Sequence, residues 1–200
     1  MIKQQQIEWI DGPVGKLETI VIPPPSDVLG IAVLIHPNPT QGGTNTNKVV
    51  QMMAKVIARR GYMAYLPNCR GVGQSIGEYD WGNGETDDVV AVIDYAKAQQ
   101  GDLPLVLGGF SFGTHVASQA RQRVEAEKLI LAGPACKRFP VPEVPKDTLV
   151  IHGEEDEVIP LADVLDWARP QALPVVVVPG CSHFFHGKLT QLADVIDRMW

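Results

Sequence analysis

The stretch Leu103-Pro-Leu-Val-Leu-Gly-Gly-Phe-Ser-Phe-Gly-Thr114 decides the fold. Its apolar run predicts a buried strand, and the spacing of the apolar residues after Ser111 predicts a helix. The turn Gly109-Phe-Ser-Phe-Gly113 is so tight that side chains at the two glycine positions would collide with the neighbouring helix and strand. Ser111 is thereby held at a helix N-terminus, where unpaired amides favour negative charge. This G-x-S-x-G spacing is typical of a nucleophile elbow, although a glycine-rich turn without chemistry shares it.

Alternating strand and helix patterns on both sides of this stretch predict an α/β fold. Two short segments, Ile7–Ile10 and Leu17–Ile22, alternate apolar and polar residues and predict an antiparallel hairpin. Further strands are expected at Gly30–Ile35, Tyr62–Leu66, Leu103–Gly108, Lys128–Ala132, Thr148–His152 and Pro174–Val178. Five helices are expected, at 46–60, from about Thr86, directly after Ser111, at 160–168 and at Leu189–Trp200. In the second helix, Asp87 and Asp88 would lie in the first turn. The third would pack through one stripe of residues, Phe112, Val116, Ala120 and Val124. These units predict a mostly parallel, doubly wound sheet of about eight strands with an antiparallel edge.

Composition limits the class of protein and its partners. The 200 residues suit one globular domain, 1–200, because a chain of this length buries most of its apolar surface. A formal net charge of −6, with scattered Lys and Arg, argues against nucleic acid or an anionic membrane as a partner. No apolar run has the length of a signal peptide core or a membrane span, so we expect a cytoplasmic protein. Cys69, Cys136 and Cys181 are odd in number and far apart, and no motif indicates a metal, nucleotide or flavin, so no cofactor is expected.

The candidate chemistry lies where functional groups gather in such sheets, at the carboxyl ends of the strands. A serine nucleophile needs a base to take its proton and a third group to hold that base. Two of the strands after Ser111 lead into an acidic loop, His152-Gly-Glu-Glu-Asp-Glu157, and a histidine loop, Pro179–His186. The residues therefore follow in the order Ser, Asp, His. We interpret Ser111, Asp156 and His183 as a catalytic triad.

Neighbouring residues compete for two of these roles. Other carboxylates surround Asp156 in the sequence, and each of them fits a solvated acidic turn. We prefer Asp156 as the triad carboxylate because the H-G-x-x-D pattern lets its short side chain reach back toward the neighbouring loop. His183 follows a turn at Gly180, whereas His186 lies closer to the final helix and fits a cap or a surface position. We expect His115 and His152 to be hydrogen-bonded packing residues.

An oxyanion hole requires two backbone N–H groups. The residue after the nucleophile, Phe112, is the first candidate donor. The second should come from the loop after Gly30–Ile35, in which Pro37 and Pro39 have no N–H to offer. Asn38, between them, is the remaining candidate, although an ordinary rigid turn would have the same sequence.

Together these motifs resemble the α/β-hydrolase superfamily of the serine-hydrolase type. The matching pieces span nearly the whole chain: His36-Pro37, Arg70-Gly-x-Gly-x-Ser75, Gly109-x-Ser-x-Gly113, His152-Gly-x-x-Asp156 and Gly180-x-x-His183. The resemblance implies a three-layer fold and hydrolysis of an ester, thioester or related acyl bond of a small molecule through an acyl-enzyme. Arg70 and Ser75 match a loop that shapes the surroundings of the site. Pro37 stands where many members have glycine, a departure that affects the oxyanion loop.

The segment Gly133–Asp147 is too short for the helical cap of many relatives. A domain without a cap predicts a shallow, open site for short acyl groups, because a long-chain lipase needs a large apolar groove. A non-catalytic binding or scaffold protein and an acyltransferase remain alternatives, because fold does not fix function. A homodimer through the antiparallel edge near residues 1–22, or through the last helix, is compatible with the sequence.

Overall fold

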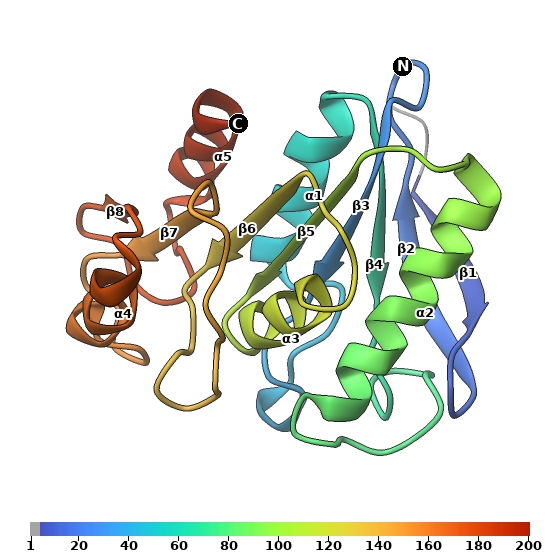
Figure 1. Ribbon diagram of the computed structural model, residues 1–200, viewed down its shortest axis with the longest axis horizontal. Helices are drawn as coiled ribbons and strands as arrows, with labels where there is room; N and C mark the ends of the chain where they lie inside the picture. The colour runs from blue at the N-terminus through green and yellow to red at the C-terminus, as the bar shows by residue number, and fades with distance from the viewer. Residues whose placement is uncertain (1–4) are drawn as a thin grey trace.

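The computed structural model describes residues 5–200 and shows one eight-stranded sheet between two layers of helices (Figure 1). The strands are β1 (Gln6–Asp11), β2 (Lys16–Ile22), β3 (Gly30–Ile35), β4 (Tyr62–Pro67), β5 (Leu105–Phe110), β6 (Lys128–Ala132), β7 (Leu149–Gly153) and β8 (Val175–Val178). Their order across the sheet is β1-β2-β4-β3-β5-β6-β7-β8. The β1–β2 and β2–β4 pairs are antiparallel and the others are parallel, which confirms the predicted α/β-hydrolase fold with its N-terminal hairpin.

Five α-helices cover the two faces of the sheet. They are α1 (Lys48–Arg59), α2 (Asn83–Gln100), α3 (Phe112–Arg121), α4 (Leu161–Ala168) and α5 (Leu189–Met199), with short 3-10 helices at Pro39–Gln41 and Arg169–Gln171. Helices α1 and α5 pack in one core cluster, while α2, α3 and α4 pack in the other (Figure 1). None of these helices, in the part of the chain described, is long and apolar enough to cross a membrane.

The central strands are apolar throughout because both of their faces are covered. Every residue of β3 and of β5 is buried. Along β3, Ile31, Val33 and Ile35 belong to one core cluster, while Ala32 and Leu34 belong to the other. This alternation follows from the two-residue period of a strand. It places the two core layers on opposite sides of the sheet.

Two helix boundaries differ from the sequence-based prediction. Helix α2 begins at Asn83, before Thr86, and its first-turn acid is Glu85, so the placement of Asp87 and Asp88 in that turn is wrong. The Glu85 carboxylate accepts hydrogen bonds from the backbone N–H groups of Asp80 and Gly82, each at 2.8 Å, which fixes the earlier start. Helix α3 ends at Arg121, so the predicted helical residue Val124 lies beyond it, where it still packs against the core.

The structure also bears on the cysteines and on the N-terminal edge. All three cysteines are free: Cys69 and Cys181 are buried, and Cys136 is partly exposed. The N-terminal edge considered as a dimer interface includes residues 1–4, which lie outside the described residues.

A buried ion pair ties the loop after β4 to α2. The Arg70 side chain donates from Nε at 3.1 Å and from Nη2 at 2.8 Å to the Asp88 carboxylate, which also accepts from the Arg70 backbone N–H at 2.8 Å. The two side chains are 10% and 0% exposed. A Cβ at Gly84 would overlap the guanidinium, so this glycine provides the space for the pair. Because the pair is buried, removing one partner leaves the other charge without compensation.

We expect Arg70→Met to lower the free energy of unfolding by about 3–5 kcal/mol, as is typical of breaking a buried ion pair. Urea denaturation of the purified protein measures this. The matched control is Arg123→Met, which removes the half-exposed pair between Arg123 and Asp87, the residue before Asp88 on α2, and should cost no more than about 1 kcal/mol. Equal costs for the two variants would contradict the structural role of Arg70.

Candidate active site

Ser111 lies at a strained turn between β5 and α3. Its φ of 54° and ψ of −118° are sparsely populated by residues other than glycine. A Cβ at Gly109 would overlap the backbone of Gly113, and a Cβ at Gly113 would overlap the carbonyl of Ile35, so no side chain fits at either position. The Ser111 N–H donates to the Ala132 carbonyl at 2.9 Å, which fixes the turn against β6. The two glycines thus have the steric role expected from the sequence.

His183 and Asp156 lie beside this serine. The His183 Nε2 atom is 3.1 Å from Ser111 Oγ, and its Nδ1 atom is 2.7 Å from Asp156 Oδ2. Both distances are those of hydrogen bonds, so the three side chains form a continuous chain. His183 is 2% exposed and Asp156 8% exposed, so the contacts are largely shielded from water. The structure therefore brings together the three residues selected from the sequence.

The loops that carry Asp156 and His183 are held together by acidic side chains that the sequence analysis treated as a solvated turn. Glu154 accepts a hydrogen bond from the Gly180 N–H at 2.9 Å, and Glu157 accepts one from the His183 N–H at 3.1 Å. The hydrogen bond from the His183 backbone lowers the pKa of Glu157. The sequence feature that could have indicated these contacts is the position of the acidic run 154–157, which directly follows β7, the strand beside β8. Two of its carboxylates position the histidine loop.

The Asp156 carboxylate is ionised by its surroundings. Its Oδ1 atom accepts from the backbone N–H groups of Val158 at 2.9 Å and Ile159 at 2.7 Å, while Oδ2 faces His183. Burial opposes ionisation, but the hydrogen bonds from His183 and Ile159 outweigh it and hold the pKa of Asp156 below its ordinary value. Asp156 is therefore a fixed negative charge on the far side of the His183 ring at neutral pH.

The other histidines have different surroundings. His152 is fully buried, with Nε2 2.9 Å from the Ile159 carbonyl, and His115 Nδ1 is 3.0 Å from the Pro140 carbonyl. Both are hydrogen-bonded packing residues, as expected. His152 Nε2 also lies 3.5 Å from Asp156 Oδ2, so this ring packs against the carboxylate that faces His183. His186 is exposed and stacks on Phe184 with ring centroids 5.9 Å apart.

The two candidate oxyanion donors come from the loop after β3 and from the start of α3. Asn38 lines a pocket with Ser111, and its side chain accepts from the Thr40 N–H at 3.0 Å. Phe112 follows Ser111 at the start of α3. Within the described residues, the backbone N–H groups of Asn38 and Phe112 have no hydrogen-bond partner.

A buried histidine holds this loop in place. The His36 Nε2 atom accepts a hydrogen bond from the Cys69 N–H at 3.2 Å, so the ring proton is on Nδ1 and donates to the Pro37 carbonyl at 2.7 Å. The ring therefore connects the loop after β4 to the loop that carries Asn38. Burial lowers the pKa of His36 to about 4, so the ring is neutral at neutral pH.

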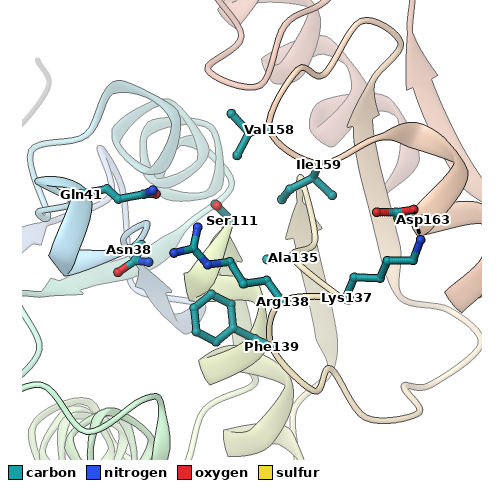
Figure 2. Close-up of a pocket in the computed structure, with 10 residues that line it drawn as sticks. All are labelled: Asn38, Gln41, Ser111, Ala135, Lys137, Arg138, Phe139, Val158, Ile159 and Asp163. Atoms are coloured by element: carbon teal, nitrogen blue, oxygen red, sulfur yellow. Dashed lines mark hydrogen bonds and ion pairs between the residues drawn. The ribbon is translucent and has the colours of Figure 1, made fainter.

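Two hollows meet at Ser111, and both are lined by Asn38, Gln41 and Val158 as well. The first, which we call the basic lobe, is completed by Ala135, Lys137, Arg138, Phe139, Ile159 and Asp163 (Figure 2). The second, the neutral lobe, is completed by Pro37, Gly42, Gly43, Asn47, His183 and Phe184. Across residues 5–200, His, Cys, Asp and Glu form no group of three that could hold a metal ion.

This arrangement defines an α/β hydrolase: a twisted, mostly parallel sheet with a serine at the strand-to-helix turn and a histidine and a carboxylate on later loops. The chain belongs to the Hydrolase_4 family of that superfamily, described as serine aminopeptidase, S33, whose model matches residues 39–147.

Solved structures of high similarity cover nearly the whole chain. XC6422 from Xanthomonas campestris, described as an α/β serine hydrolase without a lid, is 36% identical with a TM-score of 0.93, over 100% of this chain and 94% of that one. An α/β serine hydrolase homologue from Coxiella burnetii is 33% identical with a TM-score of 0.90, over 99% and 97%. Lysophosphatidylserine lipase ABHD12 of Xenopus tropicalis is 29% identical over 80% of this chain, which spans only 36% of that lipase.

The lowered pKa of His36 predicts a specific pH dependence of stability. The unfolded chain binds a proton near pH 6.5 and the folded chain only near pH 4, so the stabilisation is complete above 6.5 and is lost as the pH falls toward 4. The loss amounts to about 3 kcal/mol from this residue. Urea denaturation between pH 7 and pH 4.5 should show a weaker pH dependence in His36→Gln than in the wild type. His186→Gln is the exposed control and should keep the wild-type dependence, and an NMR titration of the wild-type His36 ring near pH 6.5 would contradict the prediction.

Proposed function

We propose that this hydrolase cleaves an ester, thioester or related acyl bond of a small substrate through an acyl-enzyme on Ser111. The observation that carries the proposal is the hydrogen-bonded chain from Ser111 Oγ through His183 to Asp156, with distances of 3.1 and 2.7 Å. Serine is a weak nucleophile until a positioned base removes its proton. Asp156, at 2.7 Å from Nδ1, holds the ring in the orientation in which Nε2 faces Ser111 Oγ.

In this mechanism His183 Nε2 takes the Ser111 proton while Oγ attacks the substrate carbonyl carbon. The carbonyl π bond opens onto the oxygen, and the negative charge is stabilised by the backbone N–H groups of Phe112 and Asn38. His183 then gives its proton to the leaving group as the acyl bond breaks. A water molecule, deprotonated by His183 Nε2, then attacks the acyl carbon of the acyl-enzyme. As the bond between that carbon and Ser111 Oγ breaks, His183 returns the proton to Oγ, which releases the acid and restores the Ser111 hydroxyl. Asp156 stays ionised throughout.

The short connection between β6 and β7 supports a small acyl group in a single domain without a cap. Residues 133–148, between β6 and β7, contain no helix, and the relative XC6422 is described as lacking a lid. A long-chain substrate needs a large apolar groove, which a short irregular connection does not provide. The family description and the lysophosphatidylserine lipases widen the range of bonds to test, so amides and lysolipids belong beside simple esters.

Ser111→Ala should reduce kcat/KM for p-nitrophenyl acetate by several orders of magnitude, as removal of the serine of a known triad reduces kcat by about 10⁶. A fluorophosphonate probe should label Ser111 in the wild type, with the modified peptide identified by mass spectrometry, and should not label the variant. Ser182→Ala, on the histidine loop, is the control and should be labelled like the wild type. A folded wild-type protein that resists the probe would support a binding or scaffold role, and acyl transfer to an added alcohol in place of water would support an acyltransferase.

Asp156→Asn should lower kcat by about 10⁴, because an amide at this position favours the wrong tautomer of the base. Steady-state kinetics with the same ester measures this. Glu155→Gln, one residue earlier, removes an exposed carboxylate and should leave kcat within about a factor of two, because exposed charges contribute little. Comparable losses in the two variants would disprove the role of Asp156.

A further inference from the structure

The basic lobe contains a cation that the proposed hydrolysis does not use. Within residues 5–200, the Arg138 guanidinium makes no hydrogen bond and no ion pair. Its neighbour Lys137 is paired with Asp163, the carboxylate of the same lobe, and that pairing raises the pKa of Lys137. The positive charge of Lys137 is thus balanced, while that of Arg138 is not.

The Arg138 side chain is directed into the site. Figure 2 shows it extended across the pocket, with the guanidinium toward the side of Ser111 and Asn38. Its Cζ atom lies 5.8 Å from the centroid of the buried Phe139 ring, within the range of a cation–π contact. This contact stabilises the side chain in the direction that Figure 2 shows.

The position of His183 determines which part of a substrate enters each lobe. The leaving group must be within reach of His183 Nε2 to receive its proton, and His183 lines the neutral lobe but not the basic lobe. The leaving alcohol or thiol therefore occupies the neutral lobe. The acyl group, on the other side of the carbonyl carbon, occupies the basic lobe beside Arg138.

We propose that Arg138 binds an anionic group at the far end of the acyl chain, so that the preferred substrates are esters of ω-carboxyacyl groups, the monoesters of dicarboxylic acids. Guanidinium binds carboxylate through two parallel hydrogen bonds. This pairing selects an acyl chain with a negative charge at its far end and also fixes the orientation of that chain. Ala135, Phe139 and Ile159 supply the apolar wall that methylene groups between the two carbonyl carbons require. The neutral lobe contains no Lys, Arg, Asp or Glu among its lining residues, so it offers no comparable site for a charged leaving group.

This inference rests on the proposed acyl-enzyme function and names its substrate class. The chain carries a formal net charge of −6, which repels an anionic substrate over most of the surface. A cation placed inside the pocket offsets that repulsion where the acyl group binds. Because Arg138 is exposed to solvent, the attraction should weaken as salt is added.

The experiment compares kcat/KM for p-nitrophenyl monoesters of glutaric, adipic and pimelic acids with that for the matching esters whose far carboxylate is a neutral methyl ester. The wild type should prefer at least one anionic substrate over its neutral partner, and added KCl should reduce the preference. Arg138→Gln should lower kcat/KM for that anionic substrate by about tenfold to a hundredfold, the range expected for a lost charge-assisted hydrogen bond, and leave the neutral ester nearly unchanged. Arg138→Lys should recover part of the loss. Arg169→Gln, which removes an exposed arginine outside both lobes, should behave like the wild type.

The possible failures are distinguishable. Neutral and anionic esters hydrolysed equally well, with or without Arg138, would overturn the substrate assignment and leave the hydrolase function in place. An Arg138-dependent gain for 4-acetoxybenzoate, in which the charge lies on the leaving group, would show that the acyl and leaving groups are assigned to the wrong lobes. A protein that hydrolyses none of these esters and resists the fluorophosphonate probe would overturn the proposed function, and the inference with it.

Discussion

The close approach of α3 to β3 and β5 is the constraint on which the site depends. It allows no side chain at Gly109 or Gly113, and it forces Ser111 into a backbone conformation that costs roughly 1–3 kcal/mol. The surrounding structure offsets that cost, because β5 is buried along its whole length and the Ser111 carbonyl accepts hydrogen bonds from the N–H and the hydroxyl of Thr114. The result is a serine hydroxyl fixed relative to the sheet.

The rest of the site follows from the register of two further strands. The parallel pairing of β7 with β8 places Gly153 opposite Val178, so the acidic loop and the histidine loop leave the same edge of the sheet side by side. A Cβ at Gly153 would overlap the Cys181 carbonyl, which shows how closely the loops approach. The Glu155 N–H donates to that same carbonyl at 3.0 Å. The distance between Asp156 and His183 is therefore set by these backbone contacts together with the hydrogen bonds that Glu154 and Glu157 accept from the histidine loop.

The sequence was sufficient for the fold, and the three side chains chosen from it lie together in the structure, because strands, turns and the order of the loops follow from local patterns. Apolar runs and glycine positions mark the strands and the turn at Ser111. The start of α2 was not predictable, because it depends on the Glu85 carboxylate folding back onto the N–H groups of Asp80 and Gly82, and the intervening Trp81 has a positive φ of 55°. The positioning contacts of Glu154 and Glu157 were also missed. Such contacts join residues 26 positions apart, and an acidic run gives no sign of which carboxylates will find a backbone partner.

The four buried histidines differ in which groups face their ring nitrogens. Burial lowers the pKa of His36, His115 and His152, so these three rings are neutral at neutral pH and bring no positive charge to the site. Each instead lies within hydrogen-bonding distance of a backbone carbonyl, those of Pro37, Pro140 and Ile159. His183 alone among the buried histidines has an ionised carboxylate at 2.7 Å on one nitrogen and a hydroxyl at 3.1 Å on the other. The Nε2 atom that takes the Ser111 proton therefore belongs to a ring whose Nδ1 already contacts an ionised carboxylate at 2.7 Å, whereas His152 Nε2 lies 3.5 Å from that carboxylate and has no hydroxyl beside it.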